Sequence, residues 1–105
     1  MKKILTLCAI ALFLSACSWV NLTPSGERVR ILSMAEVKNC KHIGKTTVSL
    51  KGKIAGIERN REKVQKELNI LARNGAADLN GDTVVPLVEP RDGKQEFAVY
   101  RCINP

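Results

Sequence analysis

Residues 60–85 read NREKVQKELNILARNGAADLNGDTVV and contain the clearest helical pattern in this chain of 105 residues. Apolar and small residues recur there at intervals of three and four, which is the spacing of one face of an α-helix. They are Val64, Leu68, Leu71, Ala72, Gly75 and Leu79. The pattern predicts one helix over residues 60–79 with a single apolar face.

Both ends of this helix carry residues that suit helix ends. Asn60 is a good N-cap. Two pairs compete for the C-terminal end, Asn74-Gly75 and Asn80-Gly81, because Asn and Gly both favour helix C-caps. The apolar pattern resumes after Gly75, so we expect the later stop. Gly75 would then lie inside the helix and let it approach the sheet closely.

Four other segments have the pattern of strands, either alternating or rich in β-branched residues. They are residues 28–32, 40–50, 83–88 and 95–102. The apolar residues of the second segment change sides near Gly44, which predicts a β-bulge. Pro86 predicts an edge or a bulge in the third segment, because proline cannot donate to a strand ladder. Arg91-Asp92-Gly93 predicts a turn.

The order of the predicted elements is β-β-α-β-β. We therefore expect an α+β fold in which one helix packs on a small antiparallel sheet.

The first residues have the layout of a bacterial signal peptide. Two lysines are followed by an apolar run over residues 4–13 and then by small residues. The sequence Leu14-Ser15-Ala16-Cys17 resembles the lipobox of bacterial lipoproteins. That resemblance implies cleavage between Ala16 and Cys17 and attachment of a diacylglycerol to the Cys17 thiol.

Two alternatives for this segment stay open. A retained membrane-spanning helix would need about 20 apolar residues, and only residues 4–16 are available. A plain secretory signal would be cut near Ala16 and would leave Cys17 unmodified. The lipoprotein interpretation is favoured because a cysteine follows the small residues directly.

The predicted organisation has three parts. Residues 1–16 are a signal peptide that is removed, residues 17–27 are a lipidated tether, and residues 28–105 form a single α+β domain. The tether segment contains turn-forming residues and no sustained periodicity. Fully extended, it would let the domain stand about 35 Å from the membrane.

Processing leaves two cysteines to be explained. Cys8 is lost with the signal, Cys17 carries the lipid, and Cys40 and Cys102 remain in an oxidising compartment. We expect a disulfide between Cys40 and Cys102, which joins the second strand to the last. A redox-active or metal-binding pair is the alternative, but the Cys-x-x-Cys spacing is missing.

Charge and aromatic content bear on the partners. The chain has 17 basic and 10 acidic side chains, a formal charge of +7, and the basic residues are dispersed. One Trp, one Tyr and two Phe are available to stack on bases. We expect no nucleic-acid partner. The expected partners are the membrane, through the lipid on Cys17, and an envelope protein or peptidoglycan. The carboxylates of peptidoglycan would attract the basic side chains of this chain.

The sequence contains no arrangement that predicts an enzyme. His42 is the sole histidine, and no nucleophile is paired with a base. Asp78, Asp82 and Glu89 lie near the turn after the helix, where cap and turn positions account for carboxylates. The glycines form no phosphate-binding loop, and the polar residues form no metal-ligand cluster. We expect no catalytic residues, no metal and no cofactor.

Several motifs together resemble a known family. Cys-x-x-Ile-Gly at residues 40–44, Ala-Ala-x-Leu-x-Gly-x-Thr-Val-Val at residues 76–85 and Val-Tyr-Arg-Cys at residues 99–102 are similar to those of small outer-membrane lipoproteins of the DUF4156 type. The chain is more distantly similar to the sensor lipoprotein of the Rcs envelope-stress phosphorelay. The sensor's long proline-rich tether and second disulfide are missing, however. The first resemblance implies an outer-membrane location and the fold given above.

These inferences give two expectations for function. The first is a lipoprotein that acts by contact in envelope structure or maintenance, without catalysis. It would be anchored in the outer membrane and face the periplasm, with exposure at the cell surface as an alternative. Ser18, directly after Cys17, resembles the sorting signal for the outer membrane. The second expectation is an envelope-stress sensor or signalling lipoprotein.

Overall fold

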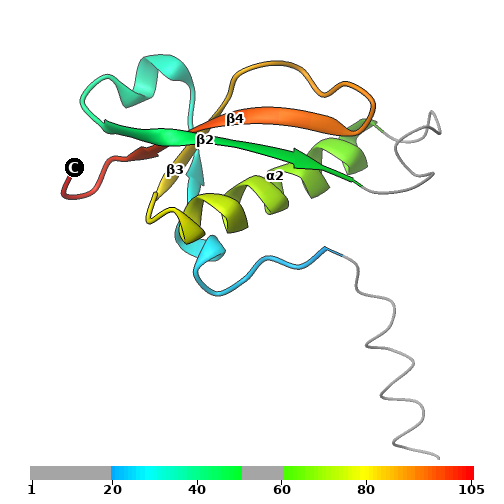
Figure 1. Cartoon of the computed structure of the whole chain (residues 1–105), viewed down its shortest axis with the longest axis horizontal. Coiled ribbons are helices and arrows are strands. Elements are labelled where there is room, and N and C mark those ends of the chain that lie inside the picture. The colour runs from blue at the N-terminus through cyan, green and yellow to red at the C-terminus, as the bar shows by residue number, and fades with distance from the viewer. Residues whose placement is uncertain (1–19, 51–60) are drawn as a thin grey trace, which may run out of the picture.

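The computed structural model describes residues 20–50 and 61–105, in which helix α2 (Arg61–Asp78) lies along one face of a four-stranded sheet (Figure 1). The strands are β1 (Arg30–Ile31), β2 (Lys41–Ser49), β3 (Thr83–Pro86) and β4 (Lys94–Arg101), in the spatial order β1-β3-β4-β2. Two short 3-10 helices, η1 (Gly26–Arg28) and η2 (Met34–Val37), flank β1. The α+β class and the order β-β-α-β-β are confirmed.

Helix α2 ends at the later of the two predicted stops. The backbone N–H of Gly81 donates to the carbonyl of Ala76 at 2.8 Å, and that of Asn80 donates to Ala77 at 3.0 Å. Asn80 adopts the left-handed conformation, with φ 64°. This arrangement is a Schellman motif, which satisfies carbonyls that the helix end would otherwise leave without partners.

Small residues bring α2 close to the sheet. A Cβ atom added to Gly75 would lie 3.0 Å from the hydroxyl oxygen of Thr46 in β2, which confirms the predicted close approach. Ala72 and Ala76 are fully buried on the face that meets the sheet. The predicted N-cap, Asn60, lies outside the described residues.

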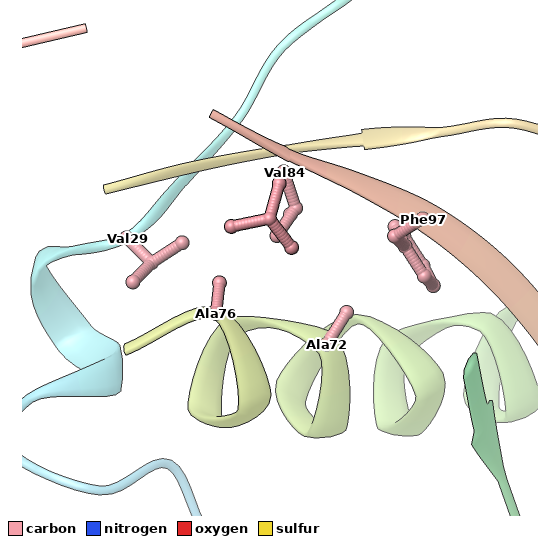
Figure 2. Packing of buried hydrophobic residues seen from close by; sticks show 6 residues of the cluster. Val29, Ala72, Ala76, Val84 and Phe97 are labelled. Atoms are coloured by element: carbon pink, nitrogen blue, oxygen red, sulfur yellow. The ribbon is translucent and has the colours of Figure 1, made fainter. Parts of the chain in front are cut away.

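The main core lies between α2 and the sheet. Its buried members are Val29, Ala72, Ala76, Val84, Phe97 and Val99. Figure 2 shows Val84 and Phe97 reaching from the strands toward the two alanines, and Val29 closing one end of the cluster. Val29 precedes β1, so the N-terminal part of the described chain contributes directly to this core.

The predicted bulge in β2 is confirmed. β2 pairs with β4 in antiparallel register, from Lys41 opposite Arg101 to Ser49 opposite Lys94, and the register shifts between His42 and Gly44. The shift places Ile43 on the same face as Val48, and both pack against the main core. Without the extra residue, these two side chains would lie on opposite faces of the strand.

One strand pair differs from the prediction of an antiparallel sheet. β1 pairs with β3 in parallel register, Arg30 with Thr83 and Ile31 with Val84, so the sheet is mixed. The reason lies in where the two strands begin. β3 starts just after the C-terminal end of α2, and the backbone N–H of Arg30 donates to the Asp82 carbonyl at that same end. Both strands therefore run away from one end of the helix.

The predicted turn is confirmed, whereas Pro86 marks the end of a strand and not an edge or a bulge, because β3 lies between β1 and β4. Pro86 is the last residue of β3, and the pairing of β3 with β1 stops at Val84. The missing N–H of Pro86 therefore costs no bond to β1. Before β4, Asp92 and Gly93 both have positive φ, at 50° and 72°. Two such residues between paired strands make a tight hairpin turn.

The face of the sheet away from α2 has a smaller core. Val37, Val85 and Ala98 are buried there, and Leu32 and Tyr100 pack against them. The connection between β1 and β2 covers this part of the face because it folds into η2. The backbone N–H of Ser33 donates to the Glu36 carboxylate at 2.8 Å, as in a capping box.

Gly81→Ala should destabilise the fold by about 1–3 kcal/mol, as overpacking of a filled site does. A Cβ atom there would collide with a methyl group of Val99 and lie 3.2 Å from the Tyr100 carbonyl oxygen. Gly44→Ala is the matched control, because no atom lies within 4 Å of a Cβ at that position. Urea unfolding of both variants measures the difference. Equal stabilities would show that the close packing at Gly81 is unimportant.

Candidate functional site

The structure describes some of the predicted site residues and not others. Ala16 and Cys17 lie outside the described residues, so cleavage and lipidation remain predictions. Among the residues that the structure describes, no helix is long and apolar enough to cross a bilayer.

The predicted disulfide is present. Cys40 lies just before β2 and Cys102 just after β4, and their sulfur atoms are bonded, with the Cα atoms 4.4 Å apart. The antiparallel pairing of β2 and β4 brings the two positions together. The bond thus ties one sheet edge to the C-terminal end of the chain.

Asp82 binds the backbone at the C-terminal cysteine of this disulfide. Its Oδ1 accepts the backbone N–H of Cys102 at 2.8 Å, and its Oδ2 accepts that of Ile103 at 2.9 Å. The Thr83 hydroxyl donates to Oδ1 at 2.9 Å. Burial raises the pKa of Asp82, but the hydrogen bonds from these donors together lower it by more. The pKa therefore lies below its ordinary value of 3.8. Asp82 therefore has a structural role, as the turn position indicated.

The outer side of α2 binds the N-terminal segment, which the sequence did not predict. The Asn74 side chain accepts the backbone N–H of Thr23 at 2.9 Å and donates to the carbonyl of Asn21 at 2.9 Å. Next to it, the Arg73 guanidinium donates to the carbonyls of Val29 at 2.8 Å and of Glu27 at 3.1 Å. Two adjacent helix residues thus hold four carbonyl and amide groups of the entering chain.

This binding changes the picture of the tether. Residues 17–27 were predicted to be a tether, but Asn21 to Glu27 are attached to α2 by these bonds. The described end of the segment is therefore part of the folded unit. From the sequence alone, Asn74 is only a candidate helix stop. Its contact with Thr23 spans 51 residues, and no local pattern reports such a contact.

A hollow lies at the other end of the molecule, near the hairpin turn of β4. It has a volume of about 590 Å³ and is lined by Thr47, residues 88–92 and residues 94–96. The amide of Gln95 is buried beside it, donates to the Val88 carbonyl at 2.7 Å and accepts from Gln65 of α2 at 2.7 Å. Acidic and basic side chains both line the hollow, so it contains groups that attract cations and groups that attract anions.

The other polar residues that the sequence analysis considered for catalysis are His42, Asp78 and Glu89, and all three are exposed. The ring of His42 meets the edge or face of Tyr100 with ring centres 5.2 Å apart. Within residues 20–50 and 61–105, no group of three or more His, Cys, Asp or Glu side chains could hold a metal ion.

The double variant Cys40→Ser/Cys102→Ser should lose about 4 kcal/mol of unfolding free energy, because the bond closes a loop with a sequence separation of 62. Reductant should destabilise the native protein similarly and leave the double variant unchanged. Urea unfolding with and without reductant measures both effects, and intact mass confirms the redox state. An unfolding free energy of the native protein that does not change with reductant would contradict the prediction.

Asp82→Asn should lower the unfolding free energy by about 1–3 kcal/mol at neutral pH, because an amide cannot accept bonds at both of its ends. The depressed pKa means that the carboxylate stabilises the fold above the ordinary pKa of 3.8. That contribution disappears as the pH falls through the native pKa. Urea unfolding should therefore show the gap between native protein and variant closing in acid.

Asp92→Asn is the control for this measurement. Asp92 lies in the exposed hairpin turn with φ 50°, a conformation that Asn adopts readily. Its substitution should change stability little. A gap for Asp82→Asn that persisted unchanged in acid would show that the charge of the carboxylate is unimportant.

Comparison with known families agrees with the resemblance of the sequence motifs. The model of a family described as "Domain of unknown function (DUF4156)" matches residues 20–102, which include all the described strands and α2. A search of curated proteins finds no match, and neither does a search of solved structures. The resemblance to the Rcs sensor lipoprotein is not shown by these comparisons. The family match covers most of the chain, and the chain therefore belongs to the DUF4156 family.

Proposed function

We propose that the protein is an exported lipoprotein, anchored in the outer membrane through Cys17, that acts by contact in envelope structure or maintenance. The observation that carries this proposal is the Cys40–Cys102 disulfide. Disulfides persist in oxidising compartments such as the periplasm and are rare in the cytosol. The fold thus favours export, as does the signal-like start of the chain, which ends in Leu14-Ser15-Ala16-Cys17.

The attachment of the N-terminal segment supports a role in which the domain is held at the membrane. Thr23 is bound to Asn74, and Val29 belongs to the main core. A lipid on Cys17 would therefore be joined to the folded unit by few intervening residues. A domain mounted in this way suits action by contact with neighbouring envelope components, because its surfaces keep a defined position relative to the anchor.

An envelope-stress sensor is the second candidate, and one observation favours it. Arg73 holds the carbonyl of Val29, and Val29 packs against the helix and the sheet. Tension on the anchored end would thus act directly on the core. A signalling role requires that the output of a stress pathway depends on the anchor. Reporter output that is unchanged by Cys17→Ser and by overexpression would exclude this candidate.

Cys17→Ser should abolish lipidation and move the protein from the membrane fraction to the soluble fraction. Intact mass of the mature protein measures the lipid, and fractionation measures the location. Cys8→Ser is the matched control, because it removes a cysteine of the predicted signal without touching the lipobox. A native protein of unmodified mass, or a Cys17→Ser variant that stays membrane-bound, would overturn the anchor.

The contact role has its own test. Crosslinking in intact cells, followed by mass spectrometry, should identify the same envelope protein or peptidoglycan adduct with the native protein in repeated experiments. Cys17→Ser, which should no longer be held at the membrane, should lose that adduct. No specific adduct with crosslinkers of several lengths would count against action by contact.

A further inference from the structure

The N-terminal segment reaches the fold on the side of α2 that faces away from the sheet (Figure 1). The buried side of α2 consists of Leu68, Ala72 and Ala76. Asn74, which binds Asn21 and Thr23, lies on the opposite side of the helix. We call this opposite side the outer face of α2. The chain thus enters the molecule at the outer face.

The outer face continues along the helix beyond Asn74. Residues four apart lie one above the other on a helix, so Lys66, Ile70 and Asn74 form a single row. Lys66 is exposed and Ile70 is half-buried. Lys63 is exposed on the same side, one turn further toward the N-terminal end of the helix. The outer face therefore carries the ammonium groups of Lys63 and Lys66 and the aliphatic side chain of Ile70, beside the half-buried carboxylate of Glu67.

The position of the anchor limits which face can meet the membrane. Only three residues lie between Cys17 and Asn21, and the four Cα–Cα steps that join them span at most about 14 Å. The face of the sheet away from α2 is further off, because the chain would have to pass the helix, about 10 Å wide, and the sheet layer about 10 Å beyond it. The anchor reaches the outer face of α2 but does not reach around the molecule.

We infer that the outer face of α2 lies against the phospholipid headgroups of the membrane, with Lys63 and Lys66 next to the lipid phosphates. This inference rests on the proposed lipidation of Cys17. It leaves the opposite face of the sheet, with Lys45 and the hollow near Thr47, turned away from the membrane. Partners in the envelope would then meet the sheet face, not the helix.

Two tryptophan variants test the orientation. In a Trp19→Phe background, Lys66→Trp places an indole on the outer face of α2, and Lys45→Trp places one on the opposite face of the sheet. Lys45 is opposite Ala98, a member of the smaller core on that face, and its side chain is 58% exposed. Both substitutions replace an exposed lysine, so each is the control for the other.

The protein with Cys17 as its first residue is coupled through that thiol to maleimide-bearing lipid in phosphatidylcholine vesicles. Cys40 and Cys102 do not compete, because they are joined in the disulfide. The vesicles also contain a lipid with a nitroxide headgroup, which quenches nearby indole fluorescence. We expect quenching of Lys66→Trp to be several-fold stronger than that of Lys45→Trp. Equal quenching, or stronger quenching of Lys45→Trp, overturns the inference.

Asn74→Ala tests whether the short connection sets the orientation. The substitution removes the bonds to Asn21 and Thr23, so the connection lengthens toward Glu27, which Arg73 still holds. The difference in quenching between the two tryptophan positions should then fall markedly. Circular dichroism verifies that the variant is folded. A difference that is unchanged in folded Asn74→Ala overturns the argument from chain length.

Failure of this inference is distinguishable from failure of the proposed anchor. Coupling through maleimide attaches the chain to lipid whether or not cells modify Cys17. Equal quenching in the vesicles therefore refutes the orientation and leaves lipidation untouched. A mature protein of unmodified mass from cells refutes the anchor and, with it, the membrane-facing role of α2 in the cell.

Discussion

The close approach of α2 to the sheet is the constraint on which the rest of the structure depends. Ala72 and Ala76 fill the contact with small side chains, and a Cβ atom at Gly75 would already crowd the hydroxyl of Thr46 in β2. The space left between the layers is then closed by Phe97 and by valines from the strands. Larger residues at the helix positions would separate the layers, because a close-packed interior has no free volume to receive them.

The C-terminal end of α2 is where both ends of the described chain are held. The helix stops at Asn80-Gly81, and the sheet begins again immediately at Thr83. Asp82, between them, binds the C-terminal backbone beside Cys102 and, through its carbonyl, the start of β1. One end of the molecule therefore collects a disulfide, a charged brace and the entry of the first strand. The N-terminal segment becomes part of the folded unit because it is bound to α2 at this same end.

The attachment of the N-terminal segment to α2 gives the proposed function a physical basis. A lipid-anchored domain on a long free tether would present all of its faces to its surroundings, whereas in this protein Asn74 holds Asn21, only four positions after Cys17. In the orientation that we infer, the helix faces the membrane and the sheet faces away from it. The polar and charged hollow near the hairpin turn lies at the end of α2 opposite to Asn74, and the inferred orientation would leave it turned away from the membrane.

The order of amino acids was sufficient for the features that depend on neighbours in the chain. Periodicity located α2, alternation and a change of sides located the bulge in β2, and counting cysteines paired Cys40 with Cys102. Packing alone decided the parallel direction of β1, the attachment of Thr23 to Asn74 and the place of Gln95 beside the hollow. These features join residues 30 to 53 positions apart, and such contacts form only once the fold has brought the segments together.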